Sequence, residues 1–193
     1  MARLHDLSVR SLLDESASES PTPGGGALAA LTAALAAGLV EMAARNSPEW
    51  ALRGAAIAQA KVLRERLAEL APLNDEVYEH ALAALRLPAA VDGDSKNELI
   101  GSSLERAAAF PLAIAEAASN VAELAAVVSE DGSPAARADA TAAAMLALGA
   151  TRAAAHLVEI NLGVGEQDER LDRATRLAAD AAAASARTLA FTR

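Results

Sequence analysis

The sequence has very few aromatic residues and little that would build a β-strand. Of its 193 residues, two are Phe, one is Tyr and one is Trp, so aromatic residues make up only 2%. Runs of Val, Ile, Thr and aromatic residues, which favour strands, are nearly absent. Alanine and leucine supply most of the 53% of residues that are hydrophobic, and alanine is the strongest helix former. The composition therefore predicts an all-α protein.

Cysteine is absent, which excludes disulfides and thiolate chemistry. Basic residues are in the minority, with 17 Lys and Arg against 26 Asp and Glu, and the formal net charge is −9. Because no basic run is available to contact phosphates, we expect no binding to nucleic acid or to an anionic membrane surface. The first ten residues, MARLHDLSVR, contain an acid and lead into no apolar stretch typical of a signal peptide. We expect a cytoplasmic protein.

Prolines, glycines and capping residues divide the chain into about seven expected helices. Ser47 and Ser133 are expected to cap helices that have a proline at their first position. Pro72 is expected to interrupt a helix, and Pro111 to kink one. Because the breaks are short, consecutive helices should pack antiparallel. The prediction is an all-α antiparallel bundle of about six to seven helices with a long kinked central helix, in a single domain over residues 1–193. The expected helices span residues 9–17, 26–45, 48–70, 73–86, 95–129, 134–162 and the segment from about 170 to the C-terminus.

The most distinctive segment is SPTPGGG, which runs directly into the apolar stretch ALAALTAALAAGLVEM. No Lys-Ser or Lys-Thr follows the glycines, so the segment is not a phosphate-binding loop of the GxxxxGK[ST] type. Residues 27–44 are short for a bilayer span, consist mostly of alanine and include Glu41. A glycine-rich entry to a helix exposes N–H groups at the positive end of the helix dipole, where a carboxylate can bind. A tight turn or a close helix crossing is the structural alternative.

Recognisable metal and hydrolase motifs are missing. The histidines His5, His80 and His156 lie on different segments, and neither a paired Glu-x-x-His motif nor a Gly-x-Ser-x-Gly motif is present. We expect no metal. The carboxylate of most interest is Asp139, which small apolar residues surround in GSPAARADATAAAML. Since a lone buried carboxylate is unfavourable, Asp139 is either exposed to solvent or kept for a function.

Several segments, in this order, resemble the cyclodeaminase domain of the formiminotransferase-cyclodeaminase family, which includes stand-alone methenyltetrahydrofolate cyclohydrolases. SPTPGGG is the most specific of them, and YEHALAALRLP, AAAFPLAIAEAA and GSPAARADATAAAMLALGATRAAAHLVEINL follow. The resemblance implies a helical bundle that forms a homodimer. It also implies an enzyme whose substrate is a tetrahydrofolate derivative. A cyclodeaminase expels ammonia from the 5-formimino form to give 5,10-methenyltetrahydrofolate, and a cyclohydrolase adds water to the methenyl form to give the 10-formyl form.

The same resemblance implies which residues form the site. Asp139 matches the family acid and is the candidate catalytic acid or base. Arg86 matches the basic residue before Leu-Pro and would pair with a carboxylate. The residues implied to bind the substrate are Thr22, Pro23, Gly24, Gly25, Gly26, Tyr78, Arg86 and Asn161.

Some polar residues of the family pattern are replaced in this chain. Asn74 stands near the place of an aspartate, Ala138 replaces a serine and Leu157 replaces an asparagine. Asp75 and Glu76 lie one or two positions from the expected acid, an offset that turns a side chain by roughly 100–200° around a helix. The alternative hypothesis is therefore a catalytically degenerate or repurposed dimeric relative. Such a protein would bind a small folate-like anion or act on another imine-like substrate.

Overall fold

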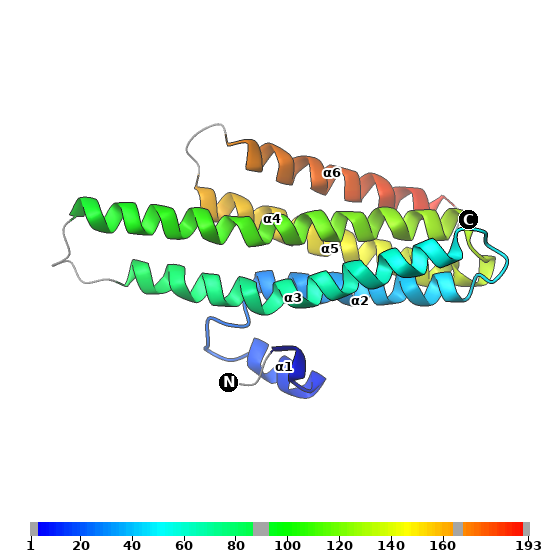
Figure 1. The fold of residues 1–193 in the computed structure, drawn as a ribbon, viewed down its shortest axis with the longest axis horizontal. Coiled ribbons are helices and arrows are strands. Elements are labelled where there is room, and N and C mark those ends of the chain that lie inside the picture. The colour runs from blue at the N-terminus through cyan, green and yellow to red at the C-terminus, as the bar shows by residue number, and fades with distance from the viewer. Residues whose placement is uncertain (1–3, 87–92, 164–167, 191–193) are drawn as a thin grey trace.

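Five long helices lie side by side and form an antiparallel bundle (Figure 1). The computed structural model describes residues 4–86, 93–163 and 168–190. Within these ranges the regular elements are all helical, which confirms the all-α prediction. The α-helices are α1 (Val9–Ser16), α2 (Gly25–Arg45), α3 (Arg53–Leu85), α4 (Gly93–Asp131), α5 (Arg137–Leu162) and α6 (Glu169–Leu189), and the 3-10 helices are η1 (Leu4–Asp6) and η2 (Pro134–Ala136).

The helix α1 lies apart from the bundle in Figure 1, and none of its residues is buried. Its start agrees with the prediction, because the Ser8 hydroxyl accepts a hydrogen bond from the Ser11 N–H at 3.0 Å. A loop then leads to α2, which begins part of the way along the bundle. The arm formed by α3 and α4 therefore projects beyond the start of α2 (Figure 1).

The core of the bundle is built mostly from alanine. Small side chains let helix axes approach closely, and α2, α4 and α5 use them where they face one another. Fully buried examples are Ala30, Ala33, Ala37, Ala118, Ala122, Ala125, Ala143, Ala147 and Ala154. By length and hydropathy alone, α2 and the segments 100–131 and 134–162 are apolar enough to cross a membrane, and 61% of the α2 window is buried inside the bundle.

The expectation that Pro72 ends a helix is wrong. Residues 53–85 form one continuous helix, α3, in place of the two expected helices. Proline removes one backbone N–H and disturbs the carbonyl four residues earlier, but packing along the rest of a long helix can outweigh that local loss. The helix α3 packs against α2 and α4, and it has buried residues both before Pro72, such as Leu67, and after it, such as Ala81. Pro111 likewise lies inside the continuous helix α4.

The prediction that Ser47 caps a helix starting at Pro48 is also wrong, since α3 begins only at Arg53. The Ser47 hydroxyl instead donates to the Ala43 carbonyl at 3.0 Å and accepts from the Ser133 N–H at 2.8 Å. It thereby ties the end of α2 to the segment before α5. Ser133 does occupy the N-cap position with Pro134 after it, but of the short helix η2, and its side chain makes no capping hydrogen bond.

Candidate functional site

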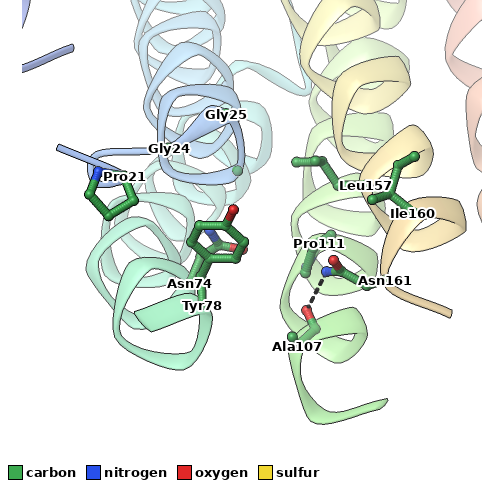
Figure 2. A pocket seen from close by; sticks show the side chains of 11 residues that line it. Pro21, Gly24, Gly25, Asn74, Tyr78, Ala107, Pro111, Leu157, Ile160 and Asn161 are labelled. Atoms are coloured by element: carbon green, nitrogen blue, oxygen red, sulfur yellow. Dashed lines mark hydrogen bonds between the residues drawn. The ribbon is translucent and has the colours of Figure 1, made fainter. Parts of the chain in front are cut away.

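A cavity of about 250 Å³ opens beside the start of α2, among residues of α2, α3, α4 and α5 (Figure 2). The loop before α2 and the first turn of α2 form one wall, and residues of α3, α4 and α5 form the others. Figure 2 shows Tyr78 and Asn74 on one side and Leu157, Ile160 and Asn161 on the other. The lining residues are Pro21, Gly24, Gly25, Gly26, Asn74, Tyr78, Ala107, Pro111, Leu157, Ile160 and Asn161.

The helix α2 begins without a side-chain cap. Its N-cap residue is Gly24, which has φ −87° and ψ −178°, and no side chain accepts from the first turn. The first N–H groups of any α-helix have no partner inside the helix. Among the described residues, no protein group accepts from the N–H groups of Gly25 and Gly26, and both residues line the cavity. The positive end of the α2 dipole therefore lies beside open space.

Gly26 is in close contact with a side chain of α3. A Cβ atom at this position would lie 2.7 Å from both Cγ and Oδ1 of Asn74, closer than such atoms approach in proteins. Asn74 itself is buried, with 9% of its surface exposed. At Gly25 the space is freer, because an added Cβ would meet only Cδ1 of Leu157, at 4.0 Å. The glycines thus serve two purposes, a close helix contact at Gly26 and an open cavity wall at Gly25.

The helix α3 presents two pairs of polar side chains to this region, each with the four-residue spacing that places side chains on one face. Asn74 and Tyr78 line the cavity. Asp75 and Glu79 contact the loop that precedes α2: Oδ1 of Asp75 accepts from the Gly24 N–H at 3.2 Å, and Oε1 of Glu79 accepts from the Thr22 hydroxyl at 2.7 Å. Burial raises the pKa of Asp75, and the hydrogen bond from Gly24 partly offsets that shift.

Asn161 is held by a backbone carbonyl that a proline has left without a partner. Pro111 has no N–H, so the carbonyl oxygen of Ala107, four residues earlier in α4, lacks its usual helical hydrogen bond. The Asn161 side-chain amide donates to this oxygen at 3.1 Å (Figure 2). One of the two N–H groups of the Asn161 side-chain amide is thus bonded to the scaffold, which holds this side chain at the cavity wall.

The structure brings only some of the predicted site residues together. Gly24, Gly25, Gly26, Tyr78 and Asn161 line one cavity, and Thr22 and Pro23 belong to the loop that borders it. Arg86 follows the last residue of α3 and is exposed. It lies eight residues after Tyr78, which is about 12 Å further along the helix axis at 1.5 Å per residue.

Asp139 lies far from the cavity in the same chain. It is a half-buried residue in the first turn of α5, whereas Asn161 is in the last turn of that helix. The 22 residues between them correspond to roughly 33 Å of helix. Within one chain, Asp139 and the cavity are therefore separated by nearly the whole length of α5.

Some residues that line or border the cavity were not among the predicted site residues, and Asn74, Asp75 and Pro111 are the most informative of them. Asn74 replaces a family aspartate and Asp75 lies one position from it, so neither matches the family acid, and the sequence indicates Pro111 only as a kink. The four-residue spacing of Asn74 to Tyr78 and of Asp75 to Glu79 indicates that each pair shares a helix face, but this spacing is informative only if α3 continues through Pro72. Among the residues that the structure describes, no group of three His, Asp or Glu side chains could hold a metal ion.

Comparisons with known proteins show the family and the fold of this chain. Residues 8–181 match the formiminotransferase-cyclodeaminase family. A methenyltetrahydrofolate cyclohydrolase from Methylorubrum extorquens is 30% identical over 192 residues, which cover 93% of this chain and 92% of that protein. The crystal structure of formiminotetrahydrofolate cyclodeaminase from Thermotoga maritima matches 97% of this chain and 96% of its own, with a TM-score of 0.84 and 23% identity.

Proposed function

The chain belongs to the formiminotransferase-cyclodeaminase family, and we propose that it opens or closes the 5,10-methenyl bridge of tetrahydrofolate. The relative at 30% identity is named a methenyltetrahydrofolate cyclohydrolase and is matched over almost its whole length. This similarity favours the hydrolytic direction as the first activity to test. It does not favour the alternative of a catalytically degenerate or repurposed relative.

The hydrolytic reaction makes and breaks one bond each at the bridge carbon. The oxygen of water bonds to this carbon in the cationic methenyl form, and the bond between the carbon and N5 then breaks. One proton of the water moves to N5 and the other is released, leaving the formyl group on N10. Negative charge develops on the added oxygen as its proton leaves, and correctly placed N–H donors stabilise such charge.

The observation that carries the proposal is the uncapped start of α2 beside the cavity. The N–H groups of Gly25 and Gly26 have no protein acceptor among the described residues and lie in the cavity wall. Their place at the positive end of the α2 dipole suits an oxygen that gains negative charge. With about 250 Å³, the cavity is smaller than the pockets that enclose a whole drug-sized ligand. It suits the ring system of the folate, with the tail outside, in the direction of Arg86.

The test is the decay of 5,10-methenyltetrahydrofolate absorbance with and without the purified protein. We expect the wild-type chain to accelerate the spontaneous decay. Gly25→Val should abolish the acceleration, because its methyl groups fill the space between Gly25 and Leu157, where an added Cβ already lies 4.0 Å from Cδ1. Gly54→Val is the matched control, since a Cβ at Gly54 meets nothing within 4 Å. No acceleration by folded wild-type protein would refute the hydrolase proposal.

The proposed active form is a homodimer, formed through a surface on α2 and α5. These two helices pack against each other and expose large apolar side chains to solvent. Leu35 has 72% of its surface exposed and Ile160 has 63%, and Met42, Met145 and Leu146 are also exposed. Exposed apolar surface of this kind is typical of a protein interface, and a second copy of the chain would bury it.

A two-fold axis crossing α5 near its middle would bring Asp139 of one subunit close to the cavity of the other. Gly149 lies almost midway between Asp139 and Ile160 in the sequence, on the exposed side of α5, and has no atom near its would-be Cβ. Two α5 helices packed antiparallel at this point would place Asp139 of the partner subunit level with Ile160, at the mouth of the cavity. Asp139 could then act as the acid or base in the partner's site.

Sedimentation velocity tests the dimer. The wild-type protein should sediment as a dimer, and Leu35→Asp should sediment as a monomer because it places a charge in the proposed interface. Val62→Asp is the control, since Val62 is also a well-exposed apolar residue, at 63% against 72% for Leu35, but lies on α3. A wild-type monomer at micromolar concentration would contradict the proposal.

A further inference from the structure

The loop that precedes α2 is fastened to α3 by two carboxylates. Asp75 accepts the Gly24 N–H at 3.2 Å, and Glu79 accepts the Thr22 hydroxyl at 2.7 Å. The two acids are four residues apart and so extend from one face of α3. The contacts link positions more than fifty residues apart in the sequence, and they join the loop to the rigid part of the bundle.

The Asp75 contact differs from an ordinary helix cap. An N-cap side chain accepts from the N–H groups of the first turn, which occupies them. Here the N-cap residue is a glycine, and the carboxylate from α3 takes the N–H of that glycine itself. The next N–H groups, of Gly25 and Gly26, therefore stay available to the cavity, and the carboxylate remains outside the cavity lining.

The carboxylates of Asp75 and Glu79 hold the loop next to the cavity wall that α3 itself supplies. Asn74 and Tyr78 precede Asp75 and Glu79 by one position each, so α3 holds the cavity wall on one face and the loop on the adjacent face. The other hydrogen bonds of the loop are local, from the Ser20 N–H to Ser18 Oγ at 3.2 Å and from the Thr22 N–H to Ser20 Oγ at 3.4 Å, and residues 16–21 are exposed. Without the two carboxylates, the loop residues would have to be ordered when the ligand binds, and that ordering opposes binding.

We propose that Asp75 and Glu79 are positioning residues, which hold the loop of residues 21–26 so that the N–H groups of Gly25 and Gly26 face the cavity before substrate arrives. This inference rests on the proposed function for its kinetic consequence. Its structural consequence, an ordered loop in the free protein, does not depend on any activity. The two can therefore fail separately.

The experiment compares removal of each acceptor with its replacement by a neutral acceptor. Asp75→Ala and Glu79→Ala remove the acceptor oxygen, whereas Asp75→Asn and Glu79→Gln retain one. Glu76→Ala is the matched control, because Glu76 is an exposed acid on the same helix. Each protein is checked for helix content and thermal stability, and then two quantities are measured. They are the hydrogen exchange rate of the Gly24 amide and the KM and kcat for 5,10-methenyltetrahydrofolate.

We expect Asp75→Ala to speed exchange at Gly24 and to raise KM about tenfold, the equivalent of about 1.4 kcal/mol, with a smaller change in kcat. Asp75→Asn should restore both quantities to within about threefold of wild type, since its side-chain oxygen still accepts from Gly24. Glu79→Ala should act in the same direction, and Glu76→Ala should change neither quantity.

Two results would overturn the proposal. Unchanged exchange at Gly24 in Asp75→Ala would show that the carboxylate does not order the loop. A loss of kcat in Asp75→Asn as large as in Asp75→Ala would show that the charge is needed, as expected for proton transfer and not for positioning. If the wild-type protein has no activity but exchange at Gly24 depends on Asp75, the positioning role stands and the proposed function fails.

Discussion

The contact between Gly26 and Asn74 predicts a change in stability whose sign depends on a second residue. In Gly26→Ala the new Cβ would lie 2.7 Å from Cγ and Oδ1 of Asn74, so the buried amide has to move. Overpacking of this kind destabilises a protein by about 1–3 kcal/mol. Replacing glycine by alanine in a helix stabilises it by up to about 1 kcal/mol. The expected net result is a destabilisation of about 0–3 kcal/mol.

Removing the Asn74 side chain should reverse that sign. In an Asn74→Ala background the overlap is gone, so Gly26→Ala should stabilise the protein by up to about 1 kcal/mol. The coupling energy between the two substitutions should then be about 1–3 kcal/mol, within the range for residues in direct contact. Urea unfolding of the wild-type protein, both single variants and the double variant gives this value, provided that the m-value is constant.

Gly101→Ala is the control for helix propensity. Gly101 lies inside α4, and a Cβ there meets nothing within 4 Å. This substitution should stabilise the protein by up to about 1 kcal/mol in both backgrounds. If Gly26→Ala stabilises the wild-type protein as much as it does the Asn74→Ala variant, the two residues are not coupled and the packing argument is refuted.

Three further predictions follow from the site and from the ion pairs. Because the pKa of Asp75 is raised in the folded state, the folded chain binds the Asp75 proton more tightly than the unfolded chain, and the free energy of unfolding should fall as pH rises from about 3.9 through the folded pKa. Urea unfolding of Asp75→Asn across this pH range should lack that fall, and a pH profile identical to that of the wild-type protein would contradict the assignment. Arg187 pairs with carboxylates on α4 at 2.8 Å and is 40% exposed. Arg187→Leu should therefore lower the free energy of unfolding by about 0.2–1 kcal/mol, and the loss should be smaller in 1 M salt; a loss that does not change with salt would rule out an electrostatic cause. Asp139→Asn should reduce kcat at least about a hundredfold. If each site of a two-fold dimer uses both subunits, an equal mixture of the Asp139→Asn and Gly25→Val proteins should recover about a quarter of wild-type activity, and no recovery in proven heterodimers would exclude the shared site.

Much of the fold could be predicted from the sequence because it depends on local signals. The helix ends at Arg45 and Leu162 lie next to residues that disfavour helix continuation, and alanine content decides the class. The errors occurred where tertiary contacts override local preference. Pro72 is a helix breaker in isolation, but α3 continues through it while packed against α2 and α4. Ser47 has the sequence context of a cap, but its hydroxyl contacts Ser133, eighty-six residues away.

The candidate site was harder to predict, for a related physical reason. The glycines near residue 25 were identifiable because a glycine run before an apolar helix has few uses. The partners of those glycines were not, because Asp75 meets Gly24 only when α3 keeps one helical register from Arg53 onward. A break at Pro72 would leave the facing direction of Asp75 undetermined. The role of Pro111 also depends on a distant residue, because the Ala107 carbonyl that Pro111 leaves without a helical partner accepts from Asn161.

The late start of α2 relative to α3 and α4 has a consequence for how this bundle can change its ligand. The alanine core is closely packed, and the cavity lies at its edge, where α2 begins later than the neighbouring helices (Figure 1). The cavity occupies the place that one more turn of α2 would fill, a length of about 5.4 Å. Insertion or deletion of three or four residues before Gly25 would therefore close or enlarge the cavity while leaving the core untouched. In such a bundle, helix length is the variable that sets the size of the ligand.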